Sequence, residues 1–126
     1  MGVQSGLAAT VELTIEEGDT AEALGSGDVP MLATPRVVAL AEEATVLAVA
    51  GHLEEGTTSV GVRVQLDHLL AVPVGRTVRC EAKLESVEGR RLTFLVSVSN
   101  DHGLVAAGKV TRAVVMRDRF LEKANE

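Results

Sequence analysis

An imidazole stands at the end of an alternating apolar segment. Residues 60–67 alternate valine and leucine with glycine or polar residues, which is the period-two pattern of a half-buried strand. His68 follows on the parity of the buried valines, ahead of two leucines and a Pro-x-Gly stop. A histidine at this place is either a structural residue with satisfied hydrogen bonds or a catalytic proton carrier.

Gly61, seven residues before His68 in the same strand, favours the catalytic interpretation. Glycine inside a strand often marks a place where a ligand approaches the backbone closely, and an exposed N–H there polarises a carbonyl oxygen. A β-bulge that lets the sheet curl is the structural alternative, and the two interpretations are compatible.

Glu42 is the carboxylate best placed for chemistry. Thr34 is a good N-cap, Pro35 suits the first helical position and Gly51 suits the stop, so the segment between them is predicted to be a helix. Valines share the face of Glu42 on that helix, so we expect a desolvated carboxylate that can act as an acid or base. The alternative is a solvated residue where the helix emerges between strands.

Other polar residues carry weaker signals. Cys80 lies on the inward parity of its strand and is predicted to be a small core residue. His52 and His102 have no ligand spacing to each other or to His68, so no metal site is expected.

Composition limits the classes of function. The chain has 126 residues, which suits one domain over residues 1–126, and its net charge of −6 argues against nucleic-acid binding. A single cysteine fits a reducing cytoplasm, and the lack of a long apolar run gives no indication of membrane spanning or export. Aromatic residues make up 2% of the chain, so valine, leucine and alanine must build the core.

The predicted elements are a strand, a loop, one long helix and four more strands. A helix that is apolar on nearly every side must be buried, so a sheet of about five strands is expected to curl around it, in an α+β fold with a partner subunit covering the rest. The strands are predicted at 7–15, 57–67, 77–87, 92–99 and 104–116, and the last four are expected to form an antiparallel meander. A short helical turn is predicted near 20–24, a hairpin turn at Glu88-Gly89 and a second turn at 100–103. A charged tail is predicted from about residue 117.

Four of these residues resemble a known functional set. Their spacing resembles that in hot-dog-fold acyl-CoA thioesterases of the group that includes fluoroacetyl-CoA thioesterase. In this chain Thr34 lies just before the helix and Glu42 follows eight residues later. Gly61 comes further along, and His68 follows it by seven residues. The segments SVEGRR (86–91) and TRAVV (111–115), with an arginine at Arg112, extend the resemblance over roughly residues 7–123.

The resemblance implies a function and a set of roles. We expect hydrolysis of an acyl-CoA to free acid and CoA, with no cofactor beyond the CoA of the substrate. Thr34, Glu42 and His68 would be catalytic, with either Glu42 or Thr34 as the nucleophile. The Gly61 N–H would stabilise the oxyanion, and Arg112 would hold substrate or support the site. Sites of this fold lie between subunits, which implies a homodimer or a tetramer of paired dimers.

One position departs from the family. The fluoroacetyl-CoA enzymes have a phenylalanine gate six residues ahead of the threonine, where this chain has Asp28, and no aromatic residue occurs in residues 1–93. We therefore expect a broader short-chain or small hydrophobic acyl group. One alternative is a non-catalytic acyl-CoA-binding or regulatory module. A second is a hot-dog enoyl-CoA hydratase. Such hydratases have an Asp and a His about five residues apart, whereas Asp67 and His68 are adjacent in this chain.

Overall fold

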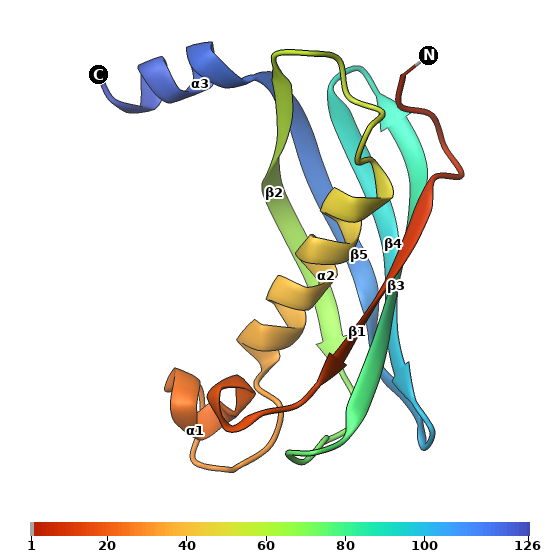
Figure 1. Cartoon of the computed structure of the whole chain (residues 1–126), viewed down its shortest axis with the longest axis vertical. Coiled ribbons are helices and arrows are strands. Elements are labelled where there is room, and N and C mark those ends of the chain that lie inside the picture. Colours follow the sequence, from red (N-terminus) through yellow and green to blue (C-terminus); the bar gives the residue numbers. More distant parts are fainter. Residues whose placement is uncertain (1) are drawn as a thin grey trace.

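The computed structural model describes residues 2–126 as one curled antiparallel sheet around a central helix (Figure 1). The sheet contains β1 (Ala8–Thr14), β2 (Thr57–His68), β3 (Thr77–Glu88), β4 (Arg91–Asn100) and β5 (Gly103–Met116), and the helices are η1 (Glu17–Asp19), α1 (Ala21–Leu24), α2 (Thr34–Ala48) and α3 (Arg117–Ala124). The α+β class, the five strands and the single long helix were predicted from the sequence, and these predictions are confirmed.

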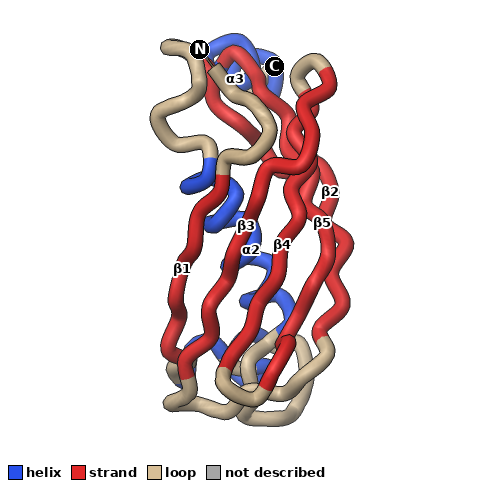
Figure 2. Tube along the Cα trace, turned by 90° about the vertical axis from the view of Figure 1, so that its right-hand side faces the viewer, coloured by secondary structure: helices blue, strands red, loops and turns tan. Residues whose placement is uncertain are grey.

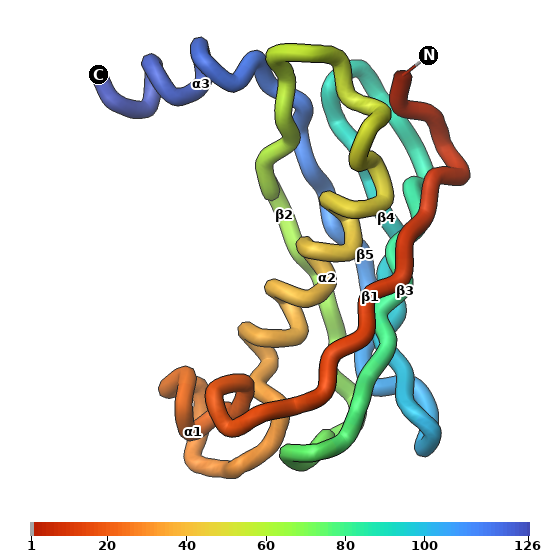
Figure 3. Tube along the Cα trace, in the orientation of Figure 1, coloured from red at the N-terminus to blue at the C-terminus, as the bar shows by residue number. Residues whose placement is uncertain are grey.

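The strand order is β1-β3-β4-β5-β2, so the predicted meander of four strands is wrong (Figure 2). Only β3, β4 and β5 follow one another as hairpins, joined by turns at 89–90 and 101–102. Two-residue turns force neighbouring strands to pair. The longer connection 69–76 instead carries the chain across one end of the sheet (Figure 3) and leaves β2 at the edge, paired with β5 alone.

The concave side of the sheet holds the core. Strand β3 alternates buried and exposed residues as the sequence predicted, and its buried residues face α2 together with Phe94 and Leu92 of β4. Each such large side chain contributes about 1.5–3 kcal/mol on burial. The buried residues of α2 are Val37, Leu40, Ala41, Ala44, Thr45 and Ala48.

The other side of α2 is open, unlike the fully buried helix that its composition predicted. Val46 and Leu47 are 46% and 48% exposed, and Glu43 is exposed as well. A sheet of five strands reaches around one side of the helix only. The helix therefore keeps Val46 and Leu47 exposed in this chain.

Three local predictions are corrected. The N-cap of α2 is Ala33 and not Thr34, whose hydroxyl makes no cap hydrogen bond, and Pro35 follows Thr34 within the first turn. The first hairpin turn is Gly89-Arg90, because Glu88 still pairs with Arg91. The predicted charged tail is the helix α3, and the described residues contain no helix long and apolar enough to span a membrane.

Candidate active site

Thr34 and His68 form a direct pair at one end of α2. The Thr34 hydroxyl and His68 Nδ1 are 2.8 Å apart. Thr34 starts α2 and His68 ends β2, so the pair connects the first turn of the helix to the end of the edge strand. The other ring nitrogen, His68 Nε2, is buried and has no hydrogen-bond partner among residues 2–126. A buried ring nitrogen without a partner is costly in a finished site.

A cavity of about 550 Å³ opens beside this pair. Thr34 and His68 line it, together with a loop that precedes α2 and the residues just after β2. Its remaining walls are mainly small or apolar, and they include Val29, Met31 and Leu69. A hydroxyl and an imidazole at the wall of an apolar cavity are suited to act on a ligand that has an apolar group.

Glu42 lies in a second cluster, farther along α2. Arg112 Nη1 donates to Glu42 Oε2 at 3.2 Å, and the same guanidinium donates from Nε to Ser59 Oγ at 2.9 Å and from Nη2 to the Ser59 carbonyl at 3.0 Å. Arg112 is 7% exposed, whereas the Glu42 side chain is 37% exposed. The predicted apolar surroundings of Glu42 are wrong, because this carboxylate pairs with a buried cation.

These hydrogen bonds indicate that Arg112 positions Glu42 and Ser59. All three of its guanidinium nitrogens are used within the chain, and the planar group is nearly enclosed. A buried arginine that donates three hydrogen bonds within the chain is held in position and holds its partners there. Of the two predicted roles for Arg112, these contacts favour supporting the site.

Gly61 lies against the Glu42 carboxylate. A Cβ placed at Gly61 would overlap Glu42 Oε2, so any larger residue here would force the carboxylate to move. The predicted bulge is also present, since the β2–β5 register shifts between Gly61 and Arg63. The structure thus brings Gly61, Glu42 and Arg112 together.

The bulge also sets the direction of His68. Gly61 pairs with Arg112, Val64 with Val110 and His68 with Ala106, and these three β5 residues are all buried on the concave side. Opposite residues of an antiparallel pair point to the same face. Residues 61 and 68 would face opposite sides of a regular strand. The extra residue at the bulge puts both on the side of α2.

The two clusters are separate within one chain. Thr34 and Glu42 are eight residues apart in α2, or about 12 Å along the helix axis. Gly61 and His68 are seven residues apart in β2, which corresponds to about 20 Å. The Thr34–His68 pair and the Glu42–Gly61–Arg112 cluster therefore do not meet in a single copy.

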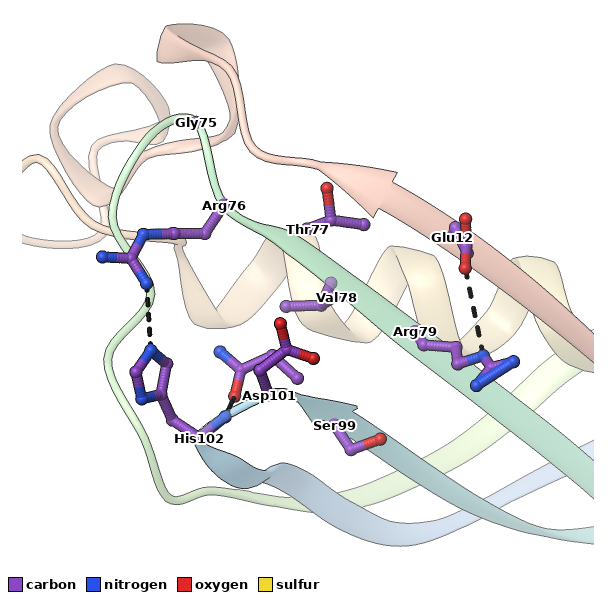
Figure 4. Close-up of a pocket in the computed structure, with 10 residues that line it drawn as sticks. Glu12, Gly75, Arg76, Thr77, Val78, Arg79, Ser99, Asp101 and His102 are labelled. Atoms are coloured by element: carbon purple, nitrogen blue, oxygen red, sulfur yellow. Dashed lines mark hydrogen bonds and ion pairs between the residues drawn. The ribbon is translucent and has the colours of Figure 1, made fainter.

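Another pocket lies on the convex side of the sheet (Figure 4). It measures about 400 Å³, and Arg76 Nη1 lies 3.0 Å from His102 Nε2 within it. Glu12 and Arg79 pair across it at 4.0 Å, with both side chains largely exposed. Its lining includes Glu12 and Asp101 beside Arg76 and Arg79, so opposite charges balance. None of the residues predicted to be catalytic lines this pocket.

Sequence reasoning did not identify Ser59. It lies two residues before Gly61 and accepts two hydrogen bonds from Arg112. A serine in a strand is too common to indicate such a role, and its partner is 53 residues away in the chain. Only the pairing of β2 with β5 brings the two together.

Comparison with known proteins identifies a family for this chain. Residues 15–118 match the family of fluoroacetyl-CoA-specific thioesterases. The fluoroacetyl-CoA thioesterase of Streptantibioticus cattleyicolor is 38% identical over 96 residues, which covers 76% of this chain and 69% of that protein.

Solved structures show the same fold. The structure of a fluoroacetyl-CoA thioesterase superposes with a TM-score of 0.91 at 33% identity, covering 99% of this chain and 97% of the other. A hot-dog-like protein from Thermanaerovibrio acidaminovorans superposes with a TM-score of 0.88 at 24% identity, covering 95% and 89% of the two chains. The predicted hot-dog fold is therefore confirmed.

Proposed function

The chain belongs to the fluoroacetyl-CoA-specific thioesterase family and is an acyl-CoA thioesterase, and we propose that Thr34 and His68 carry out its chemistry with help from Glu42 and Gly61. The substrate class is a short-chain or small hydrophobic acyl-CoA, which is cleaved to the free acid and CoA. Neither the binding-module alternative nor the hydratase alternative is favoured by these relatives.

The contact between Thr34 and His68 is the observation that carries this proposal. A hydroxyl and a base 2.8 Å apart, lining an apolar cavity, are the parts of an activated nucleophile. Thr34 has no capping role that would occupy its hydroxyl. His68 Nδ1 can therefore accept the Thr34 proton as the oxygen attacks.

The proposed reaction has two steps, acylation of Thr34 and hydrolysis of the acyl-threonine ester. Thr34 Oγ attacks the thioester carbon while His68 Nδ1 takes its proton, and the proton then goes to the CoA sulfur as the carbon–sulfur bond breaks. A water molecule next attacks the acyl-threonine ester, giving its proton to His68, which returns it to Thr34 Oγ. Proton transfer by a positioned side chain is generally worth roughly 10²–10⁴ in rate.

Glu42 and Gly61 complete the site from a second copy. His68 Nε2 has no hydrogen-bond partner within residues 2–126. Glu42 uses its Oε2 atom to bind Arg112, and its Oε1 atom makes no hydrogen bond within the same residues. If two β2 strands pair antiparallel around a two-fold axis near Val64, Gly61 of one copy lies opposite His68 of the other. Glu42 would then orient the imidazole of the partner, and the Gly61 N–H would face the substrate oxyanion, a contact worth about 3–4 kcal/mol.

Exposed surfaces next to β2 support a homodimer. Edge strand β2 has one unpaired side, and Val62 on it is 48% exposed. Helix α2 adds further exposed apolar side chains, since Val46 and Leu47 are 46% and 48% exposed. Natural proteins rarely leave such an edge uncovered.

The cavity supports the expected acyl class. Its walls carry no aromatic side chain, and Asp28 lines it where the fluoroacetyl-CoA enzymes have the gate. A volume of about 550 Å³ is larger than an acetyl group needs, so small branched or short linear acyl groups fit.

Release of free thiol from a panel of acyl-CoAs tests the function. We expect His68→Ala and Glu42→Gln to lower kcat by roughly 10²-fold or more. His102→Ala and Glu43→Gln are matched controls at exposed positions and should retain wild-type rates. Wild-type rates in both site variants, with the fold intact, would remove the assignment.

Mixing two inactive variants tests the shared site. In a dimer of one Glu42→Gln chain and one His68→Ala chain, one site carries both defects and the other carries none. With random exchange, half of the dimers are mixed, so activity should return to roughly a quarter of wild type. If Glu42 and His68 of the same chain act together, mixing restores nothing.

A further inference from the structure

Helix α3 is the least buried element of the chain. None of its eight residues is buried within residues 2–126, and it extends away from the sheet at the β2 edge (Figure 1). Phe120 and Leu121 are 42% and 43% exposed, and Met116, one turn before Phe120, is 51% exposed. An isolated helix of this length is marginal in water, and an apolar stripe on it needs a partner.

The cavity beside Thr34 and His68 has an incomplete rim. Val29 and Leu69, which line it, are 48% and 59% exposed. The chain has two aromatic residues, and Phe94 is fully buried in the core. Phe120 is therefore the aromatic residue available to close an apolar cavity.

The proposed two-fold axis places α3 beside this rim. Met116 pairs with Thr57, so α3 starts at the end of β2 opposite His68. In an antiparallel β2–β2 pair, the Thr57 end of one strand lies next to the His68 end of the other. Helix α3 is about 12 Å long and points away from its own sheet (Figure 1). The proposed pairing then directs it toward the cavity of the partner.

Charge favours the same contact. Residues 16–30 lead to the cavity rim and contain no lysine or arginine. Their carboxylates are Asp19, which pairs with Arg36 at 2.9 Å, and Glu16, Glu17, Glu22 and Asp28, which have no cationic partner among residues 2–126. Helix α3 carries three cationic residues against two acidic ones: Arg117, Arg119 and Lys123 against Asp118 and Glu122. Opposite charges around an apolar contact fix its orientation and register.

We propose that α3 of one chain closes the acyl cavity of its partner, with Phe120 and Leu121 against Val29 and Leu69. The occupant of this face is thus a second copy of the chain, which contributes an aromatic wall to a site that has none of its own. This inference rests on the two-fold dimer proposed above. It makes Phe120 a specificity-determining residue, because its ring limits the length of the acyl group.

Disulfide trapping tests the contact directly. Phe120 and Leu69 lie beyond opposite ends of the 12-residue strand β2, so they are about 40 Å apart within one chain. Mixing a Leu69→Cys chain with a Phe120→Cys chain should give a covalent dimer on a non-reducing gel. Leu95→Cys, at an exposed position on the convex side, mixed with Phe120→Cys is the control and should give none. No product from the first pair, or equal product from both, would overturn the proposal.

Kinetics provide a second readout. We expect Phe120→Ala to shift the preferred acyl group to longer chains, with roughly tenfold higher KM for short acyl-CoAs and little change in kcat. Leu104→Ala, at an exposed position near the start of β5, is the matched control and should keep the wild-type profile. An unchanged profile in Phe120→Ala contradicts the role of Phe120 while leaving thiol release intact. Loss of thiol release in the wild type would instead contradict the proposed function, and the trapping result would still report on α3.

Discussion

Gly61 and Glu42 come from β2 and α2, and the strand backbone at Gly61 lies directly against the Glu42 carboxylate. A Cβ at Gly61 would overlap Glu42 Oε2, so this contact requires glycine as long as the carboxylate keeps its position. The same carboxylate accepts from Arg112 at 3.2 Å, so its position is fixed from two sides. The glycine therefore has a steric reason in addition to any oxyanion contact.

Gly61→Ala should move the Glu42 carboxylate away from the strand. We expect kcat to fall by roughly 10²-fold, because orientation of a catalytic group depends on sub-ångström placement. Thiol release by the purified variant measures this. Gly18→Ala is the control, since a Cβ there meets no described atom within 4 Å, and it should behave as wild type. Full activity in Gly61→Ala would mean that the close approach has no functional consequence.

Arg112→Lys should weaken both the site and the fold. Lysine keeps the positive charge but cannot contact Ser59 and Glu42 together as the guanidinium does. We expect a loss of about 1–3 kcal/mol in the free energy of unfolding, measured by urea titration, and a lower kcat. Arg91→Lys, at an exposed position, should change neither quantity. A stable Arg112→Lys protein with wild-type kcat would contradict the supporting role.

Thr34 substitutions separate chemistry from helix capping. Thr34→Ser retains the hydroxyl and should remain active, whereas Thr34→Val should lose roughly 10²-fold or more in kcat. Because Ala33 is the N-cap, Thr34→Val should not incur the roughly 0.5–2 kcal/mol that loss of a capping hydroxyl typically costs. A melting experiment on both variants checks this. A large stability loss together with normal turnover would point to capping after all.

Cys80 should be unreactive in the folded protein. Burial, with the nearby carboxylates of Glu43 and Glu81, raises the pKa of its thiol to about 12 from an ordinary value of 9.0. The thiolate is the reactive form, so at pH 8 its population is roughly a thousandfold below that of the unfolded chain. Reaction with a thiol reagent before and after addition of urea measures the difference. Rapid labelling of the folded protein would contradict the burial of this residue.

The same shift has a consequence for stability at high pH. The protonated thiol is favoured in the folded state, so its contribution is fully present below pH 9 and is lost as the pH rises from 9 toward 12. Urea midpoints of wild type and Cys80→Ala should therefore converge as the pH increases through this range. Parallel midpoints at all pH values would show that the thiol does not titrate there.

Much of the fold could be predicted from local pattern. The alternation in β3 and the spacing of apolar residues in α2 depend on neighbours in the sequence, so the strands, the helix and the α+β class followed from them. The spacing of Thr34, Glu42, Gly61 and His68 likewise identified the family before any coordinates. The helix α3 was missed because its eight residues are mostly charged and carry little periodic signal.

The tertiary structure alone decided how those residues meet. A bulge beside Gly61 turned it to the face of His68, and pairing of β2 with β5 brought Ser59 to Arg112. The sequence predicted that the Thr34 hydroxyl caps the helix, but in the structure this hydroxyl is hydrogen-bonded to His68, 34 residues away. Such choices depend on contacts between distant segments, and those contacts are fixed by packing and strand register rather than by the local preferences that a sequence displays.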